Sequence, residues 1–101
     1  MMIVFTSCAN MEEARKLAQL IIDQRLAACV QFHEVGSMYT WKGELKAVKE
    51  TLMVIKTLES KLQHIEDVIS ANHSYSVPEI AAVDVRRINR PYKEWMQEVM
   101  G

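Results

Sequence analysis

The feature that most constrains the fold is a pair of long β-rich segments separated by the dipeptide Lys42-Gly43. They span residues 27–41 and 44–57, and Gly36 predicts a bulge or bend inside the first. At ~3.3 Å per residue, the second segment alone gives an arm of roughly 45 Å. Ordinary strands contain about 5–6 residues. A hairpin of this length extends beyond its own domain, so we expect it to contact a partner.

Two segments of helical periodicity flank the hairpin. Apolar residues recur at helical spacing within residues 14–22 and again within residues 58–69. Asn10 can cap the first helix, with Glu12 and Glu13 in its first turn, where carboxylates interact favourably with the helix dipole. Pro91 opens a short last helix, a position where proline is tolerated.

Short β-rich runs at residues 3–7 and 80–85 complete the pattern. The order strand–helix–strand–strand–helix–strand predicts an α+β fold, the ferredoxin-like βαββαβ sandwich, with a C-terminal helix added. Both long helices then lie on one face of the sheet. A length of 101 residues fits one domain over residues 1–101.

The strands also predict self-association. Residues 52–55 and 80–83 are apolar at every position. Because side chains alternate along a strand, such runs are apolar on both faces of the sheet. The helices can cover only one face, so the other face and the exposed hairpin edge require another subunit. The pattern predicts a homo-oligomer without giving its number.

Composition excludes several classes of protein. A formal net charge of −1 removes the electrostatic case for nucleic-acid binding. No apolar run reaches the roughly 18 residues of a membrane span, and the short apolar start lacks the features of a signal peptide. Two cysteines do not make a disulfide scaffold. We therefore expect reduced thiols and a cytoplasmic protein.

The loop after the second helix gathers the groups best suited to chemistry. His73, Tyr75 and Glu79 place an imidazole, a phenol and a carboxylate within seven residues. Imidazole and carboxylate suit copper or zinc, although two groups do not complete a site. The alternative is a helix cap and turn that only orders the last strand. No pair among the remaining histidines and the cysteines has a chelating spacing; these are His33, His64, Cys8 and Cys29.

The hairpin carries a second set of candidates. Tyr39 and Trp41 point to the same side of their strand, either as a packing pair at an interface or as the wall of a ligand pocket. Glu50 and Lys56 interrupt an otherwise apolar strand. No catalytic triad or phosphate-binding glycine loop is visible, and we expect no enzyme.

Several motifs together resemble one family. The matching stretches, in chain order, are Arg25-Leu26-Ala27-Ala28-Cys29-Val30, Ser37-Met38-Tyr39-Thr40-Trp41-Lys42-Gly43, Ile55-Lys56-Thr57, His73-Ser74-Tyr75 with Pro78-Glu79-Ile80, and Tyr92 with Trp95. In this combination the sequence is similar to the CutA family of divalent-cation tolerance proteins over nearly its whole length.

The resemblance implies a ferredoxin-like homotrimer whose hairpins reach neighbouring subunits, copper or other divalent-cation binding, a cytoplasmic location and no established reaction. Family positions that match here imply a ligand-binding cleft between subunits, formed by Tyr39, Trp41, Glu50, Lys56, Tyr75 and Glu79, and a metal ligand at His73.

The chain departs from the family at three positions of the implied metal site. Ser74 stands where the family often has proline, and Asn72 where some members have a second histidine. Some members carry a cysteine in the first strand near Thr6, whereas the nearest thiol here is Cys8. The fold therefore carries over more securely than the site. The leading expectation is a copper-binding cation-tolerance homotrimer. The alternatives are a small-molecule signalling module like the trimeric PII-type proteins, with an anionic ligand at Tyr39, Trp41 and Lys56, and a structural scaffold.

Overall fold

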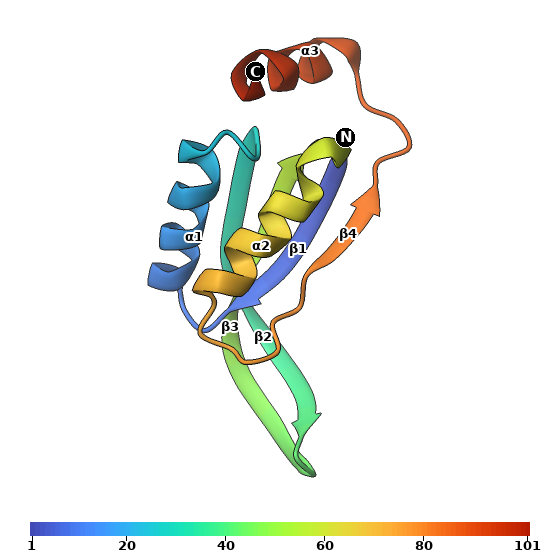
Figure 1. The fold of residues 1–101 in the computed structure, drawn as a ribbon. Coiled ribbons are helices and arrows are strands. Elements are labelled where there is room, and N and C mark those ends of the chain that lie inside the picture. The colour runs from blue at the N-terminus through green and yellow to red at the C-terminus, as the bar shows by residue number, and fades with distance from the viewer.

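The computed structural model describes all 101 residues as a four-stranded antiparallel sheet with two helices against one face and a third helix at one end (Figure 1). The sheet order is β2-β3-β1-β4. The predicted α+β, ferredoxin-like fold is confirmed. The elements in chain order are β1 (Met2–Cys8), α1 (Met11–Asp23), β2 (Cys29–Trp41), β3 (Glu44–Thr57), a 3₁₀ turn (Glu59–Lys61), α2 (Leu62–Asn72), β4 (Ala81–Asp84) and α3 (Arg90–Met100).

The long hairpin forms as predicted. β2 and β3 pair without interruption from Cys29 opposite Lys56 to Trp41 opposite Glu44. Gly36 lies opposite Lys49 in this unbroken register, so the predicted bulge is wrong. The pairing of β2 with β3 continues through Gly36 with no extra residue on either strand. The hairpin extends beyond the rest of the molecule, whose extents are 46 × 25 × 21 Å (Figure 1).

The core lies between the sheet and the helices. Alternate residues of β1 and β3 face α1 and α2, and the apolar core they form has 12 buried residues. Its largest fully buried side chains are Val4, Leu17, Ile21, Met53, Ile55, Ile65 and Ile69. Burial of each large side chain stabilises the fold by about 1.5–3 kcal/mol. The core therefore fixes the ends of β1, α1 and α2 relative to one another.

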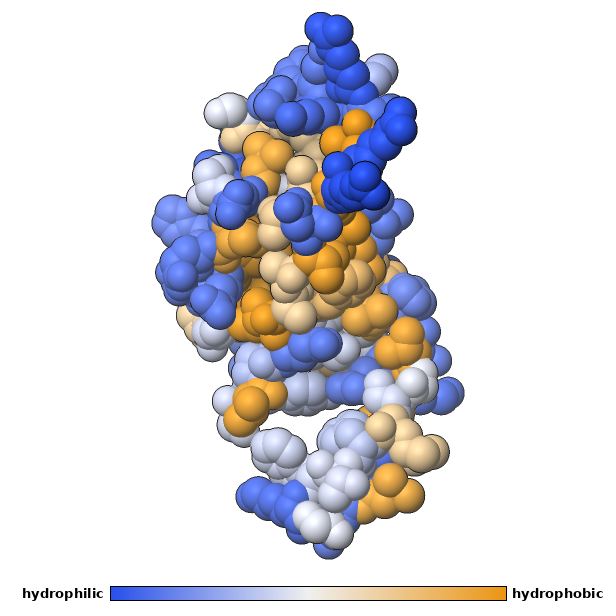
Figure 2. Space-filling view, turned by 90° about the vertical axis from the view of Figure 1, so that its right-hand side faces the viewer, coloured by the Kyte–Doolittle hydropathy of each residue, from blue (hydrophilic) through white to orange (hydrophobic).

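The opposite face of the sheet is also apolar. Ile3 and Phe5 of β1 and Leu52 and Val54 of β3 alternate with the core residues and remain partly exposed. The edge strand β4 is exposed at all four positions. Viewed from the side on which Figure 1 places β4, apolar side chains gather over the body of the molecule (Figure 2). We call the side of the sheet that carries Ile3, Phe5, Leu52 and Val54 the open face.

The C-terminal helix stands at one end of the molecule (Figure 1). Asn89 precedes it and Pro91 lies in its first turn, as predicted. Met96 and Met100 are its buried residues. None of the helices combines the length and apolar character needed to cross a bilayer.

Candidate functional site

His73 joins the end of α2 to the end of β1. Its backbone N–H caps α2 by donating to the carbonyl of Ile69. Its Nε2 lies 2.8 Å from the carbonyl oxygen of Ser7, and its Nδ1 accepts a 3.0 Å hydrogen bond from the backbone N–H of Tyr75. An acceptor role for Nδ1 assigns the proton of the neutral ring to Nε2, which then donates to Ser7. The predicted helix-cap role is therefore present.

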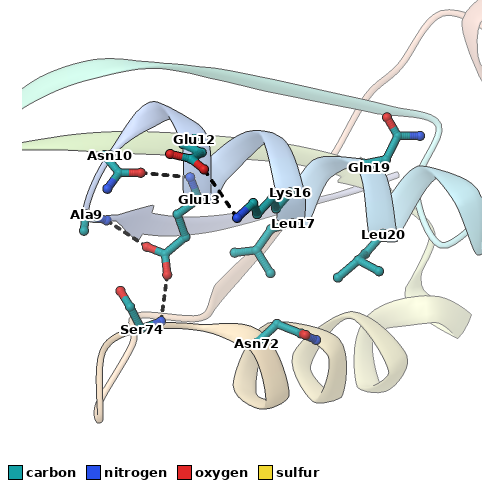
Figure 3. Close-up of a pocket in the computed structure, with 10 residues that line it drawn as sticks. All are labelled: Ala9, Asn10, Glu12, Glu13, Lys16, Leu17, Gln19, Leu20, Asn72 and Ser74. Carbon is teal, nitrogen blue, oxygen red and sulfur yellow. Dashed lines mark hydrogen bonds and ion pairs between the residues drawn. The ribbon is translucent and has the colours of Figure 1, made fainter.

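Glu13, in the first turn of α1, contacts the loop that follows α2 near His73. Asn10 caps this helix by accepting a 2.9 Å bond from the N–H of Glu13, as its position predicted. The Glu13 carboxylate in turn accepts backbone N–H bonds from Ala9 at 3.0 Å and Ser74 at 2.7 Å (Figure 3). This is a variant of the reciprocal capping box. The carboxylate connects the start of α1 to the loop after α2.

The pKa of Glu13 reflects these contacts. Partial burial alone would raise the pKa of this carboxyl. The N–H bonds from Ala9 and Ser74, together with the positive charge that His73 carries when it is protonated, outweigh burial and lower the pKa. Glu13 is therefore a carboxylate at neutral pH.

Cys8 lies at the end of β1 and is fully buried. Its thiol is 3.5 Å from the thioether sulfur of Met53. Burial, and then the negative charges of Glu13 and Glu50, raise the pKa of the Cys8 thiol to about 12. The side chain is thus a protonated thiol at neutral pH, and a metal ion that binds the sulfur would have to displace this proton.

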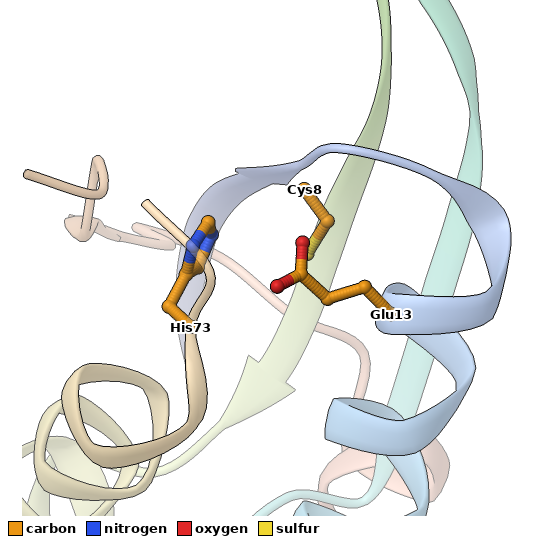
Figure 4. Close-up of side chains that lie close together, drawn as sticks. All are labelled: Cys8, Glu13 and His73. Carbon is orange, nitrogen blue, oxygen red and sulfur yellow. The ribbon is translucent and has the colours of Figure 1, made fainter. Parts of the chain in front are cut away.

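These three residues form one cluster. The Cys8 sulfur, a Glu13 carboxylate oxygen and a His73 ring nitrogen all lie within 4.8 Å of one another (Figure 4). We call this group the cysteine–histidine cluster. Thiolate, imidazole and carboxylate together are the donors that bind transition metals. Each ring nitrogen of His73 already has a backbone partner, so a bound ion would have to displace one of them.

A groove between α1 and the end of α2 shares Glu13 with this cluster. Its volume is about 760 Å³, and Glu13 and Ser74 line it together with Lys16 and Leu17 (Figure 3). Lys16 is paired with Glu12 across 3.4 Å at the exposed rim. Glu13 thus belongs to both the groove and the cluster, whereas Cys8 and His73 do not line the groove.

A second concavity collects most of the predicted cleft residues. Tyr39, Trp41, Glu50, Tyr75 and Glu79 line one cleft of about 700 Å³ beside the hairpin. The Tyr75 hydroxyl donates a 2.7 Å hydrogen bond to Glu50. Burial, and then this bond to a carboxylate, raise the pKa of Tyr75. Hairpin and loop thus bring together residues that are distant in sequence.

Lys56 is the exception among the predicted cleft residues. It lies opposite Cys29 and Ile3 in the sheet, and its ammonium is 5.9 Å from the ring centroid of Tyr92. It lies six positions after Glu50, which along a strand is roughly 20 Å. Within one chain the cleft therefore has no basic side chain among its lining residues. The sequence placed Lys56 in a cleft between subunits, so its part in that cleft stays a prediction.

The other candidate ligands stay outside both sites. His33 and His64 are exposed, and Cys29 is partly exposed at the start of β2. From the sequence, Cys8 was not predicted to lie near His73, and Glu13 was predicted only to lie at a helix start. One signal was available: the end of the first strand and the end of the second helix lie at the same end of a βαββαβ sandwich.

Comparison with known proteins agrees with the fold and with the shared motifs. A family model described as "CutA1 divalent ion tolerance protein" matches residues 2–99. A divalent-cation tolerance protein CutA from Thermococcus kodakarensis is 36% identical over 97% of this chain and 94% of its own. The protein CutA of Homo sapiens is 36% identical over 94% of this chain, which spans only 54% of the human protein.

A solved structure gives the same result. The periplasmic divalent cation tolerance protein CutA from Archaeoglobus fulgidus superposes with a TM-score of 0.96 at 29% identity, over 100% of both chains. The open face and the long hairpin described above therefore belong to a fold already observed in related proteins.

Proposed function

The chain belongs to the family of CutA1 divalent ion tolerance proteins, and from this premise we propose that it binds copper, or another divalent cation, at the cysteine–histidine cluster and acts as a homotrimer. The observation that carries the metal proposal is the meeting of Cys8, Glu13 and His73 within 4.8 Å. Three different parts of the fold supply these donors, so folding brings them together.

Copper is favoured by the softness of the donors. The buried thioether of Met53 lies 3.5 Å from the Cys8 thiol, which places a second sulfur beside the cluster. Thiolate and thioether ligands select Cu(I), and imidazole suits both copper and zinc. The Cys8 thiol must lose its proton when it binds a metal ion, so the apparent affinity rises with pH.

Binding requires a local rearrangement around His73. One ring nitrogen must exchange its backbone partner, either the Ser7 carbonyl or the Tyr75 N–H, for the ion. The Glu13 oxygens retain free lone pairs while they accept from Ala9 and Ser74. The rearrangement is therefore confined to the imidazole and the loop that follows α2.

The test is a titration of the tag-free protein with Cu(I), under argon and against a chromogenic Cu(I) chelator, with Zn²⁺ measured in parallel by calorimetry. We expect saturable binding of one ion per chain that Cys8→Ser and His73→Ala abolish. Cys29→Ser and His64→Ala are the matched controls, because both residues lie outside the cluster. Binding that persists unchanged in Cys8→Ser and His73→Ala would refute the site.

Self-association has a separate basis. The open face carries partly exposed Ile3, Phe5, Leu52 and Val54, and such a surface is typical of an interface. The number three comes from the family resemblance. Sedimentation equilibrium tests it, with an expected mass three times that of the 11.6 kDa chain. A concentration-independent monomer would exclude this part of the proposal.

We also propose a cytoplasmic location and a binding role without catalysis. Both cysteines are free thiols, which suits a reducing compartment. The family is described by tolerance of divalent ions and not by a reaction. Fractionation of the source cells, with detection of the untagged chain, tests the location.

A further inference from the structure

Met53 brings a second sulfur atom to the buried side of the cysteine–histidine cluster. It lies on β3 opposite Thr6 of β1, and its side chain belongs to the core that α1 and α2 cover, not to the open face. Met53 and Cys8 are both 0% exposed. The Cys8 thiol donates to the Met53 thioether across 3.5 Å. The thioether therefore accepts at the place that the Cys8 proton occupies.

The two sulfur atoms are close enough to be ligands of one ion. Metal–thiolate bonds such as those of zinc are about 2.3 Å long. Two donor atoms can share an ion when they lie closer together than twice that length, and these two are 3.5 Å apart. An ion that replaces the Cys8 proton is therefore within reach of the Met53 sulfur.

The donors of the cluster differ in burial and in chemistry. The two sulfurs are fully buried, whereas Glu13 and His73 are only partly buried (Figure 4). Thiolate and thioether ligands select Cu(I), while a carboxylate oxygen is a ligand of divalent ions such as Zn²⁺. The cluster thus offers a soft, dry side at Met53 and a harder, wetter side at Glu13.

Charge separates the two sides further. A Cu(I) ion that replaces the Cys8 proton leaves the net charge of the cluster unchanged, because one unit of positive charge replaces another. A Zn²⁺ ion adds one more positive charge, which the carboxylate of Glu13 neutralises. Buried charges are stable only when they are paired. A neutral thioether therefore suits the monovalent ion, and a carboxylate suits the divalent one.

We propose that the third ligand of the cluster depends on the ion, Met53 for Cu(I) and Glu13 for a divalent ion such as Zn²⁺. Cys8 and His73 are ligands of both. On binding, the Cys8 S–H bond breaks, the proton leaves to solvent and the sulfur bonds to the ion, with no change in oxidation state. This inference rests on the proposed metal site, to which it adds a ligand and a basis for distinguishing the two kinds of ion.

The test compares the affinities of the tag-free protein, in its native oligomeric state, for Cu(I) and Zn²⁺ by competition with chromogenic chelators under argon. Met53→Leu removes the thioether and nearly conserves side-chain volume, an exchange that protein cores tolerate well. We expect it to weaken Cu(I) binding about tenfold or more and to leave Zn²⁺ binding unchanged. Glu13→Gln should do the reverse. Met96→Leu, at a fully buried methionine of α3 outside the cluster, is the matched control and should change neither affinity.

X-ray absorption spectroscopy supplies a readout that is independent of affinity. The Cu(I) complex of the wild type should show scattering from both sulfur atoms, whereas that of Met53→Leu should show the Cys8 sulfur alone. The Zn²⁺ complex should show a single sulfur in both proteins. A methionine that only fills the core would not appear in either spectrum.

Three outcomes would overturn the inference. One is equal Cu(I) affinity in Met53→Leu and Met96→Leu. Another is a loss of Zn²⁺ affinity in Met53→Leu as large as the loss for Cu(I), which a purely structural role would cause. The third is an equal effect of Glu13→Gln on both ions. In these cases the proposed metal site stands as long as Cys8→Ser abolishes binding, whereas full binding in Cys8→Ser and His73→Ala would refute the site and the inference together.

Discussion

At the scale of single residues, Glu13 links three features of the molecule. It lies in the capped first turn of α1, it accepts the N–H of Ser74 from the loop after α2, and it belongs to the cysteine–histidine cluster. The sequence predicted the first role from helix-start patterns. The other two could not be predicted locally, because Ser74 lies 61 residues further along the chain.

Replacing Glu13 by glutamine tests its structural role. The amide side chain has one acceptor oxygen in place of two, so one of the backbone N–H groups of Ala9 and Ser74 loses its partner. We expect a loss of about 1 kcal/mol in the free energy of unfolding at neutral pH, at the low end for charged hydrogen bonds because the carboxylate is partly solvated. Urea denaturation at fixed protein concentration measures it.

The pH dependence has a definite sign. The folded protein holds the pKa of Glu13 below its ordinary value of 4.5, so the stabilisation is present above that pH and is lost as the pH falls. The difference between wild type and Glu13→Gln should therefore shrink in acid. Glu12→Gln is the control, since its exposed pair with Lys16 contributes little. A difference that persists undiminished in acid contradicts the prediction.

Two buried threonines on the core side of the sheet provide a matched pair. Thr6 is fully buried and its hydroxyl has no hydrogen-bond partner, whereas the Thr57 hydroxyl donates a 2.6 Å bond to the Leu26 carbonyl. Thr6→Val should raise the free energy of unfolding by about 1 kcal/mol, because it removes an unpaired buried hydroxyl. Thr57→Val should lower it by about 1–2 kcal/mol. Equal losses in both variants would refute this assignment.

At the scale of elements, the hairpin shows what local sequence does and does not determine. The strand over residues 44–57 and the turn at Lys42-Gly43 were predictable, because the turn dipeptide interrupts two β-rich runs. The bulge expected at Gly36 is wrong because glycine is only permissive, and continuous pairing on both sides keeps the register. A glycine allows a bulge without requiring one.

In the candidate sites too, some features follow from the local sequence and others do not. Tyr39 and Trp41 reach one cleft because strand parity places them on one side, and parity is visible in the sequence. The proximity of Cys8 to His73 arises from the packing of β1 against α2, which no spacing within the sequence encodes. Lys56 was grouped with Glu50 by family resemblance in a cleft between subunits, and within one chain the strand between them holds the two roughly 20 Å apart.

The hairpin turn carries its own prediction. Lys42 and Gly43 both have positive φ, 51° and 79°, as a two-residue turn of type I′ requires. Asparagine adopts this conformation more readily than lysine, so Lys42→Asn should stabilise the protein by about 0.5 kcal/mol. Gly43→Ala should destabilise it by about 1 kcal/mol for the opposite reason. Thermal unfolding measures both, and a stabilising Gly43→Ala would contradict the turn type.

At the scale of the whole molecule, one hydrophobic face remains to be covered. The helices cover one side of the sheet, and the open face leaves Phe5 and Val54 paired side by side and partly exposed. A sheet that is apolar on both faces is stable in water only when both are covered. The proposed trimer supplies that cover, and the hairpin that extends past the body offers a further contact between subunits.

Val54→Glu tests whether the open face is the interface. A carboxylate at the centre of this face would be buried unpaired on association, at a cost of several kcal/mol per ion. In the separated chain the same side chain is partly exposed and its charge can be hydrated. We therefore expect the variant to sediment as a monomer of 11.6 kDa while circular dichroism retains the α+β spectrum.

The control variant introduces a glutamate on the helix layer, away from the open face. Ile22→Glu introduces a carboxylate on α1 at a position that is 40% exposed, outside the open face. This variant should keep the mass of the wild-type assembly. If Val54→Glu also keeps that mass, the subunits must associate through the hairpin edges alone, because an unpaired charge at the centre of the open face cannot be buried without loss of affinity.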